Sequence, residues 1–218
     1  MAGSLLETLK ALIERTYGMP PLLTDLAPFI VGDRGLRALY GTDPAAQEGA
    51  ARLLVRETGH GLRAVVYYPD ALVRHLERHN PLRGLGDVNI TGFSVLVEEV
   101  DHLLVLAHRA AQGRRTTRLE LEHHAGVTKY LAVVHFLGRQ IGRPRLPEPL
   151  RLWARHHLFE RYAAGPAETE ARYRRAARLA RRYVDRLDAL PRAARRRELL
   201  AFERRPFQET QRLLGEVN

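Results

Sequence analysis

The feature that most constrains the fold is a hydrophobic stretch at residues 89–141, which is interrupted by one polar segment at 112–115. Each half, 93–111 and 119–141, is long enough for a complete α-helix, and a short polar break between two such helices predicts an antiparallel helix hairpin. At 103–107 apolar residues point in every direction around the helix, as is typical of a helix surrounded by protein. We therefore expect the core to come chiefly from residues 93–107 and 119–137.

A change of period upstream of this stretch predicts a small β-hairpin at about 51–68. Two runs rich in β-branched and aromatic residues flank a turn that contains two glycines. A two-stranded ribbon is marginally stable alone, so it must pack on helices or pair with a further strand. Helices are predicted at 5–15, behind the N-cap residue Ser4, and at 71–79, whereas the segment 19–48 is expected to form only one or two helical turns.

A proline-rich segment at 144–149 is the strongest candidate boundary in the chain. Beyond it the pattern predicts helices at 150–164, at 167–190 and from 191 to about 214. We expect a break or a kink in the last helix at Pro206, because proline removes a helical hydrogen bond and clashes with the preceding turn.

These elements predict three parts: a core domain at 1–143, a linker at 144–149 and a basic helical subdomain at 150–218. The predicted fold class is mainly α (α-rich α+β). It is a helical bundle around the central antiparallel helix hairpin (about 89–141), with one small β-hairpin (about 51–68) and an arginine-rich C-terminal helical part.

Composition excludes several classes of chemistry. Cysteine is absent from the 218 residues, so the chain has no disulfides, no thiolate metal ligands and no thiol nucleophile. The first residues lack a basic segment followed by an apolar core, and no run approaches the roughly 18 apolar residues that span a bilayer. Walker-type, dinucleotide-binding and serine-hydrolase motifs are absent from the sequence. These observations predict a cytoplasmic protein without a membrane partner.

Basic residues are concentrated in the second half of the chain. Residues 1–100 carry 10 basic and 12 acidic side chains, whereas residues 101–218 carry 25 and 13, a net charge of +12. Arginine accounts for 33 of the 35 basic residues, a skew typical of GC-rich coding that weakens the interpretation of any single arginine as a selected contact. In the helix predicted at 167–190 an apolar stripe is flanked by five candidate partner-binding residues: Arg174, Arg175, Arg178, Arg181 and Arg182.

Both predicted core helices contain a Glu-x-x-His pattern, which places a carboxylate and an imidazole on one helix face. In ferritin-like bundles two such pairs, with further carboxylates, hold two metal ions. The candidate ligands for Fe, Mn or Zn are therefore Glu99, His102, Glu120 and His123. A hairpin that turns near residue 114 separates the two patterns by two to three turns of ~5.4 Å, too far for one two-metal site. If they bind no metal, these carboxylates and imidazoles are expected to form hydrogen bonds inside the bundle.

Lysine occurs only at positions 10 and 129, and the same register places Lys129 near Glu98 and Asp101. Because an unpaired buried charge is costly, we expect an ion pair of Lys129 with Asp101 or Glu98, and His102 nearby. The pair either fixes the register of the hairpin or belongs to an acid/base site, for which Glu98, Asp101, His102 and Lys129 are the catalytic candidates. Most of the 10 histidines are expected at the surface or at helix edges.

The leading functional hypothesis is a non-enzymatic cytoplasmic accessory protein. It would contact an acidic protein partner, or a second copy of itself, through the basic C-terminal helical face, and it needs no cofactor. The alternative is a metal-binding protein or acid/base enzyme that uses the Glu/Asp/His/Lys cluster of the central hairpin. A second alternative is sequence-tolerant nucleic-acid binding, because a row of arginines can also follow a phosphate backbone.

Overall fold

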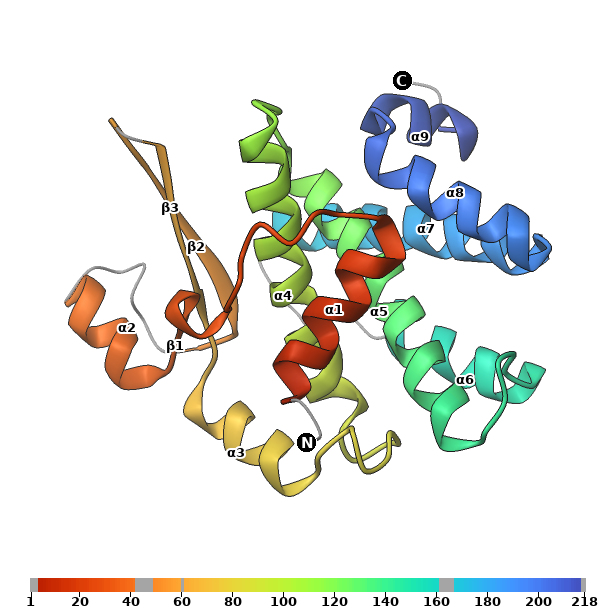
Figure 1. Cartoon of the computed structure of the whole chain (residues 1–218), viewed down its shortest axis with the longest axis horizontal. Helices are drawn as coiled ribbons and strands as arrows, with labels where there is room; N and C mark the ends of the chain where they lie inside the picture. The colour runs from red at the N-terminus through yellow and green to blue at the C-terminus, as the bar shows by residue number, and fades with distance from the viewer. Residues whose placement is uncertain (1–3, 42–48, 60, 161–166, 217–218) are drawn as a thin grey trace.

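A computed structural model of the chain describes residues 4–41, 49–59, 61–160 and 167–216, and helices dominate it (Figure 1). The α-helices are α1 (Leu5–Tyr17), α2 (Asp33–Tyr40), α3 (Asp70–Arg78), α4 (Ile90–Ala111), α5 (Arg118–Gln140), α6 (Glu148–Phe159), α7 (Ala167–Ala189), α8 (Arg192–Arg204) and α9 (Phe207–Leu213). A 3-10 turn, η1 (Ala27–Phe29), precedes the strands β1 (Ile30–Val31), β2 (Arg52–Thr58) and β3 (Gly61–Tyr67). The expected fold class, a mainly α bundle with a small β-hairpin, is confirmed.

The long helices α4 and α5 form the predicted antiparallel hairpin at the centre of the molecule (Figure 1). The side chain of Thr117 caps the N-terminus of α5 by accepting a hydrogen bond from the backbone N–H of Glu120. The predicted core is confirmed, since buried residues of both helices, such as Phe93 and Phe136 with ring centroids 4.8 Å apart, belong to one hydrophobic cluster.

The sheet contains one strand more than the sequence predicts. β2 and β3 pair antiparallel from Arg52↔Tyr67 to Thr58↔Gly61, as expected, but β1 adds a parallel strand on the other side of β3. The segment 19–48 was expected to form only helical turns. A strand of two residues is too short to show an alternating pattern, which explains the omission. The buried Val66 of β3 belongs to the same hydrophobic cluster as the buried residues of α4.

Of the helices after the proline-rich segment, α6 and α7 pack along α5, whereas α8 packs on α1 and α7. α6 begins at Glu148, inside the predicted linker, because proline is tolerated in the first turn of a helix. α6 ends at Phe159, whereas the sequence predicts helix to 164, and residues 161–164 lie outside the described part of the chain. The predicted break at Pro206 is confirmed, since it separates α8 from α9. The division into two domains stays a prediction.

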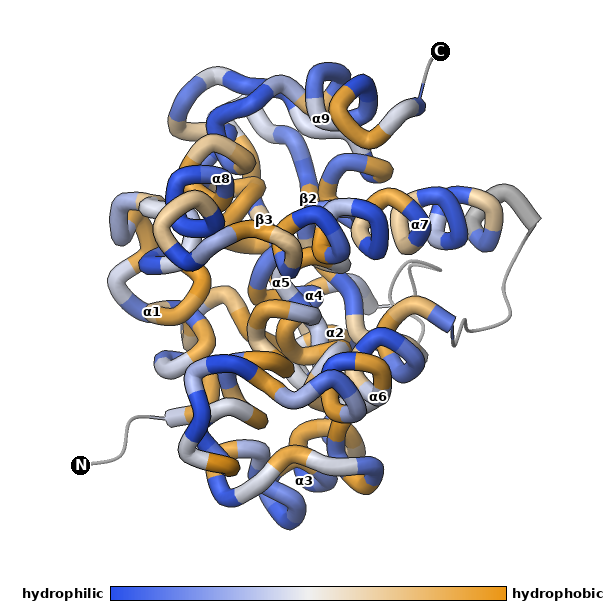
Figure 2. The backbone as a smooth tube through the Cα atoms, turned by 90° about the vertical axis from the view of Figure 1, so that its right-hand side faces the viewer, coloured by the Kyte–Doolittle hydropathy of each residue, from blue (hydrophilic) through white to orange (hydrophobic). Residues whose placement is uncertain are grey.

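Helix α7 is amphipathic, and hydrophobic and hydrophilic stretches alternate along it in Figure 2. Its apolar side, with Ala176, Ala180 and Tyr183, is buried, and a Cβ added at Gly126 of α5 would come within 2.7 Å of the Ala180 Cβ. The two helices thus approach closely at this glycine. Among the described residues, none of the helices has the length and apolar character needed to cross a membrane.

Candidate functional site

The register of the hairpin decides which titratable side chains meet. Arg109 of α4 forms an ion pair with Glu120 of α5. About three turns nearer the start of α4, Glu98 forms an ion pair with Lys129. These contacts confirm the register expected from the sequence. They also create an outer cluster of five titratable side chains between the two helices: Glu98, Glu99, His102, Glu122 and Lys129.

Lys129 and Glu98 form the closest contact of the outer cluster. Nζ of Lys129 lies 2.5 Å from Oε2 of Glu98, and the two side chains are 19% and 17% exposed. This is one of the two lysine pairs that the sequence predicts. The other expected partner, Asp101, is fully buried and contacts His124 instead, so the candidate catalytic group of Glu98, Asp101, His102 and Lys129 is split between two places.

His102 is buried and faces carboxylates with both ring nitrogens. Nδ1 lies 3.6 Å from Oε2 of Glu99, one turn earlier on α4, and Nε2 lies 4.0 Å from Oε2 of Glu122 on α5. Nε2 has no hydrogen-bond partner, and neither has Oε2 of Glu99. A buried polar atom without a partner is uncommon in proteins, which makes this side of the imidazole a candidate ligand position.

Three side chains of the outer cluster have the geometry of a cation site. One ligand atom each from Glu98, His102 and Glu122 lies within 4.8 Å of the others. Glu98 and His102 are four residues apart and share a face of α4, while Glu122 comes from α5. Metal bonds of ~2.0–2.1 Å place ligand atoms roughly 3.3 Å apart, so the side chains would need to close by about 1.5 Å.

The ligand set differs from the one that the two Glu-x-x-His patterns predict. Glu120 is paired with Arg109, far along the hairpin from His102. The His123 ring packs against Phe202 and Phe207, with both centroids 5.5 Å away, and burial lowers its pKa to about 3, so it is neutral. Of the four predicted ligands, the structure brings only Glu99 and His102 together.

The carboxylates and cations of the outer cluster shift one another's pKa. Burial lowers the pKa of His102, but the three neighbouring carboxylates outweigh it and raise the value to about 9. Burial and the charge of Glu98 raise the pKa of Glu122 to about 7. Burial raises the pKa of Glu98, yet Lys129 and His102 lower it overall. With a pKa of about 7, the carboxyl group of Glu122 exchanges a proton near neutral pH.

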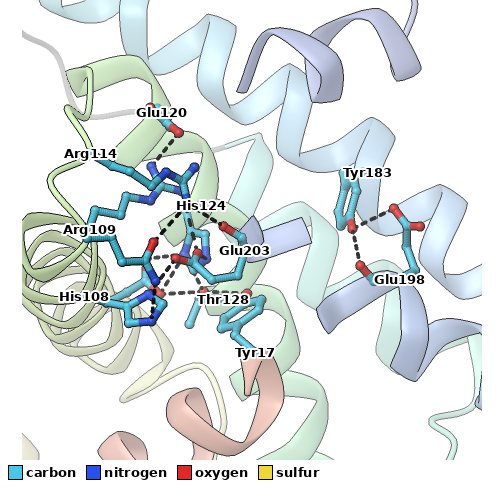
Figure 3. Close-up of polar contacts among 12 residues, drawn as sticks. Tyr17, His108, Arg109, Arg114, Glu120, His124, Thr128, Tyr183, Glu198 and Glu203 are labelled. Atoms are coloured by element: carbon cyan, nitrogen blue, oxygen red, sulfur yellow. Dashed lines mark hydrogen bonds and ion pairs between the residues drawn. The ribbon is translucent and has the colours of Figure 1, made fainter. Parts of the chain in front are cut away.

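A second group of polar residues, the inner network, lies deeper in the bundle (Figure 3). Nδ1 of His124 lies 2.8 Å from Oδ2 of Asp101, and Nε2 lies 3.2 Å from Oε2 of Glu203 on α8. The Thr128 hydroxyl donates to Oδ1 of Asp101 over 2.7 Å, and the Tyr17 hydroxyl lies 2.8 Å from the Thr128 oxygen. The network therefore connects α1, α4, α5 and α8.

Glu203 contacts three basic side chains from the end of α4 and the turn that follows it. Its carboxylate lies 3.1 Å from Nδ1 of His108 and 3.6 Å from a guanidinium nitrogen of Arg109, and its backbone carbonyl accepts a hydrogen bond from Arg114 (Figure 3). Burial raises the pKa of Glu203, but the bond to His124 and the charge of Arg109 lower it to about 2. The inner network is thus an ion-pair network closed to solvent, as expected of a structural element.

Of the nine histidines in the described part of the chain, five are half-buried or exposed, and the other four are buried in the central helices. His102, His108, His123 and His124 are all buried, because each finds a carboxylate or an aromatic ring inside the bundle. Sequence reasoning also missed Glu203 and the role of Arg109. The register already placed Arg109 opposite Glu120, so that pair had a signal. Glu203 had none, since its partners depend on where α8 docks.

The five candidate partner-binding arginines are not equivalent. Arg175 lies 2.8 Å from Glu216, Arg181 lies 3.2 Å from Glu160, and Arg174 forms an ion pair with Glu170. Arg182 donates to the backbone carbonyl of residue 214 over 3.3 Å. Arg178 is exposed and has no ion pair with the described residues. Three of the five are thus already neutralised within the chain.

The chain matches no family model, and no curated protein or solved structure shows significant similarity to it.

Proposed function

We propose that this protein binds one divalent transition-metal ion, Fe²⁺, Mn²⁺ or Zn²⁺, through Glu98, His102 and Glu122. The observation that carries the proposal is the buried Nε2 of His102, which lacks a hydrogen-bond partner while two carboxylates lie within 4.8 Å. Carboxylate oxygen and imidazole nitrogen are ligands that these metals share.

Glu99 supports this assignment from the opposite side of the ring. A metal-bound histidine usually donates its other N–H to a carboxylate, which fixes the tautomer and the ring orientation. Nδ1 of His102 faces Glu99 at 3.6 Å, so Nε2 is the nitrogen left for a metal. A bound cation would also relieve the repulsion between the carboxylates of Glu98 and Glu122, which lie close together with little exposure.

Metal analysis of untagged protein tests the proposal. Protein purified without a chelator, or stripped and titrated with Mn²⁺, Zn²⁺ or anaerobic Fe²⁺, is expected to hold one equivalent by mass spectrometry and calorimetry. His102→Gln removes the imidazole ligand and should abolish this binding. The matched control is His135→Gln, because His135 is a half-buried histidine on α5 outside the outer cluster.

The control variant distinguishes metal binding at the proposed site from nonspecific metal binding at the protein surface. Retention of the metal by His102→Gln, or loss of it from both histidine variants, would contradict the proposal. So would a failure of wild-type protein to bind any of the three ions above background.

A second candidate function, which we also propose, is contact with an acidic protein through the C-terminal helices. Residues 170–216 contain 14 arginines and seven acidic residues, and six of the seven acidic side chains already contact a basic group of this chain. The surplus positive charge is available to an external acidic partner. Exposed arginines without an ion pair among the described residues are Arg178, Arg186, Arg192, Arg196, Arg197, Arg204 and Arg212.

Charge variants of α7 test this second function. Arg178, Arg182 and Arg186 are spaced by four residues and share the exposed side of α7, opposite the buried face. Replacing all three with Gln should weaken binding of a glutamate-rich peptide more than replacing the ion-paired Arg174, Arg175 and Arg181. Tighter binding of a DNA duplex of equal charge, at the same salt, would favour the nucleic-acid alternative instead.

A further inference from the structure

Lys129 offers its charge to the same carboxylate that the proposed metal needs. Its ammonium nitrogen lies 2.5 Å from Oε2 of Glu98, and Glu98 is one of the three candidate ligands. The contact joins α5 to α4 at the level of the outer cluster, with both side chains mostly buried. Any ion held by Glu98 would thus have a cation as its immediate neighbour.

The charges of the outer cluster explain what the lysine does there. Three carboxylates, those of Glu98, Glu99 and Glu122, surround His102, and Lys129 is the second basic side chain in contact with them. Packing this many like charges together at low exposure is unfavourable unless cations compensate them. An ammonium and a divalent ion can both provide that compensation, and their mutual repulsion disfavours having both at full occupancy.

The choice of lysine rather than arginine matters for the geometry. An ammonium on a flexible stem contacts one carboxylate oxygen at a time, whereas a guanidinium binds both oxygens as a fork. The lysine contact is to Oε2 of Glu98, and the second oxygen of the carboxylate accepts no hydrogen bond from the lysine. In a chain with 33 arginines and two lysines, position 129 thus carries the basic residue that is easier to displace.

We infer that Lys129 is a built-in competitor of the metal ion: its ammonium compensates Glu98 when no ion is bound and weakens the affinity of the site for a divalent cation. This inference rests on the proposed metal function. It makes the fold independent of metal and turns the outer cluster into a site with reversible occupancy. The expected ligand class is the same divalent transition metal, now held less tightly than the three ligands alone would hold it.

Calorimetric titration of Mn²⁺ and Zn²⁺ into three proteins tests the inference. Lys129→Met keeps the length of the side chain and removes the charge, so it should bind the ion at least tenfold more tightly than wild type. Lys129→Arg keeps the charge and can occupy both oxygens of Glu98, so it should bind equally or more weakly. Without metal, Lys129→Met should melt at a lower temperature than wild type, and added metal should raise its melting temperature by more.

The outcomes distinguish a failure of the lysine competition from a failure of the proposed metal binding. If wild type binds metal and His102→Gln does not, but Lys129→Met binds equally or more weakly, then the lysine orients Glu98 for the ion and the competition is wrong. If no protein of the set binds metal, the proposed function itself fails and the inference with it. Should Lys129→Met not fold, Lys129→Gln, which can still donate a hydrogen bond to Glu98, replaces it with the same expected direction.

Discussion

Oε2 of Glu203 lies 3.2 Å from Nε2 of His124, and this contact joins α8 to the centre of the helix hairpin. Both side chains are only 2% exposed. Because Arg109 and His108 also face this carboxylate, one acidic residue from the C-terminal helices contacts basic side chains of both α4 and α5. The attachment of the C-terminal helices therefore depends on charge compensation as well as on apolar packing.

Glu203→Gln is expected to lower the free energy of unfolding by about 3 kcal/mol, because removal of one partner leaves buried cations uncompensated. Equilibrium unfolding in urea measures the change. Glu77→Gln on the exposed side of α3 is the control, since a surface substitution of this kind usually changes stability by less than about 0.5 kcal/mol. A similar small loss for both variants would show that Glu203 does not stabilise the fold.

The loss of folding stability at acid pH should depend on Glu203. The pKa of Glu203 falls from a usual value of 4.5 to about 2 in the folded protein. Its contribution is therefore complete above pH 4.5 and is lost as the pH falls through about 2. The stability difference between wild type and Glu203→Gln should be constant from neutral pH down to about 5 and shrink below it. A difference that stays constant down to about pH 3 would contradict the shift.

The loss of folding stability at alkaline pH should depend on His124. Burial lowers its pKa, but Asp101 and Glu203 outweigh burial and raise it from 6.5 to about 9. The contribution is complete below pH 6.5 and is lost as the pH rises through about 9. Wild type should therefore lose stability over this range, and His124→Gln should lose less. His135→Gln is the comparison, because it retains both His124 and His102, whose pKa is also raised to about 9. Equal pH profiles for wild type and His124→Gln would exclude this assignment.

The close approach of α5 and α7 makes a prediction about packing. Gly126→Ala should destabilise the protein by about 2 kcal/mol, since the new methyl group would lie 2.7 Å from the Ala180 Cβ. Alanine would otherwise favour the helix by about 1 kcal/mol. Adding Ala180→Gly should restore most of the loss, as judged by the urea midpoint. If the single variant is as stable as wild type, the two helices are not in contact at this point.

Much of the fold could be predicted from local patterns. The two halves of the hydrophobic stretch became α4 and α5, the glycine-containing turn became the β2–β3 hairpin, and Pro206 separated α8 from α9. Each of these signals lies within one element or its two ends. β1 was missed because a two-residue strand is stabilised by its partner, through Ile30↔Val66 and Val31↔Tyr67, and not by its own pattern.

The candidate site was predictable only as far as the register of the hairpin extends. A polar turn at 112–115 places Glu98 beside Lys129 and Arg109 beside Glu120, and counting residues from the turn gave both levels. The same counting could not say which of two neighbouring acids, Glu98 or Asp101, would meet the lysine. That choice depends on the rotation of α4 about its axis, which the surrounding helices set.

The sequence by itself determined the helices, their breaks and the pairing level of α4 with α5, because these depend on periodicity, on proline and glycine, and on loop length. The tertiary structure decided the environment of each charge. Docking of α8 brought Glu203 to His124, 79 residues away in the chain, and rotation of α5 brought Glu122 to His102. Such contacts join segments far apart in sequence, and no local pattern records which faces will meet when the bundle closes.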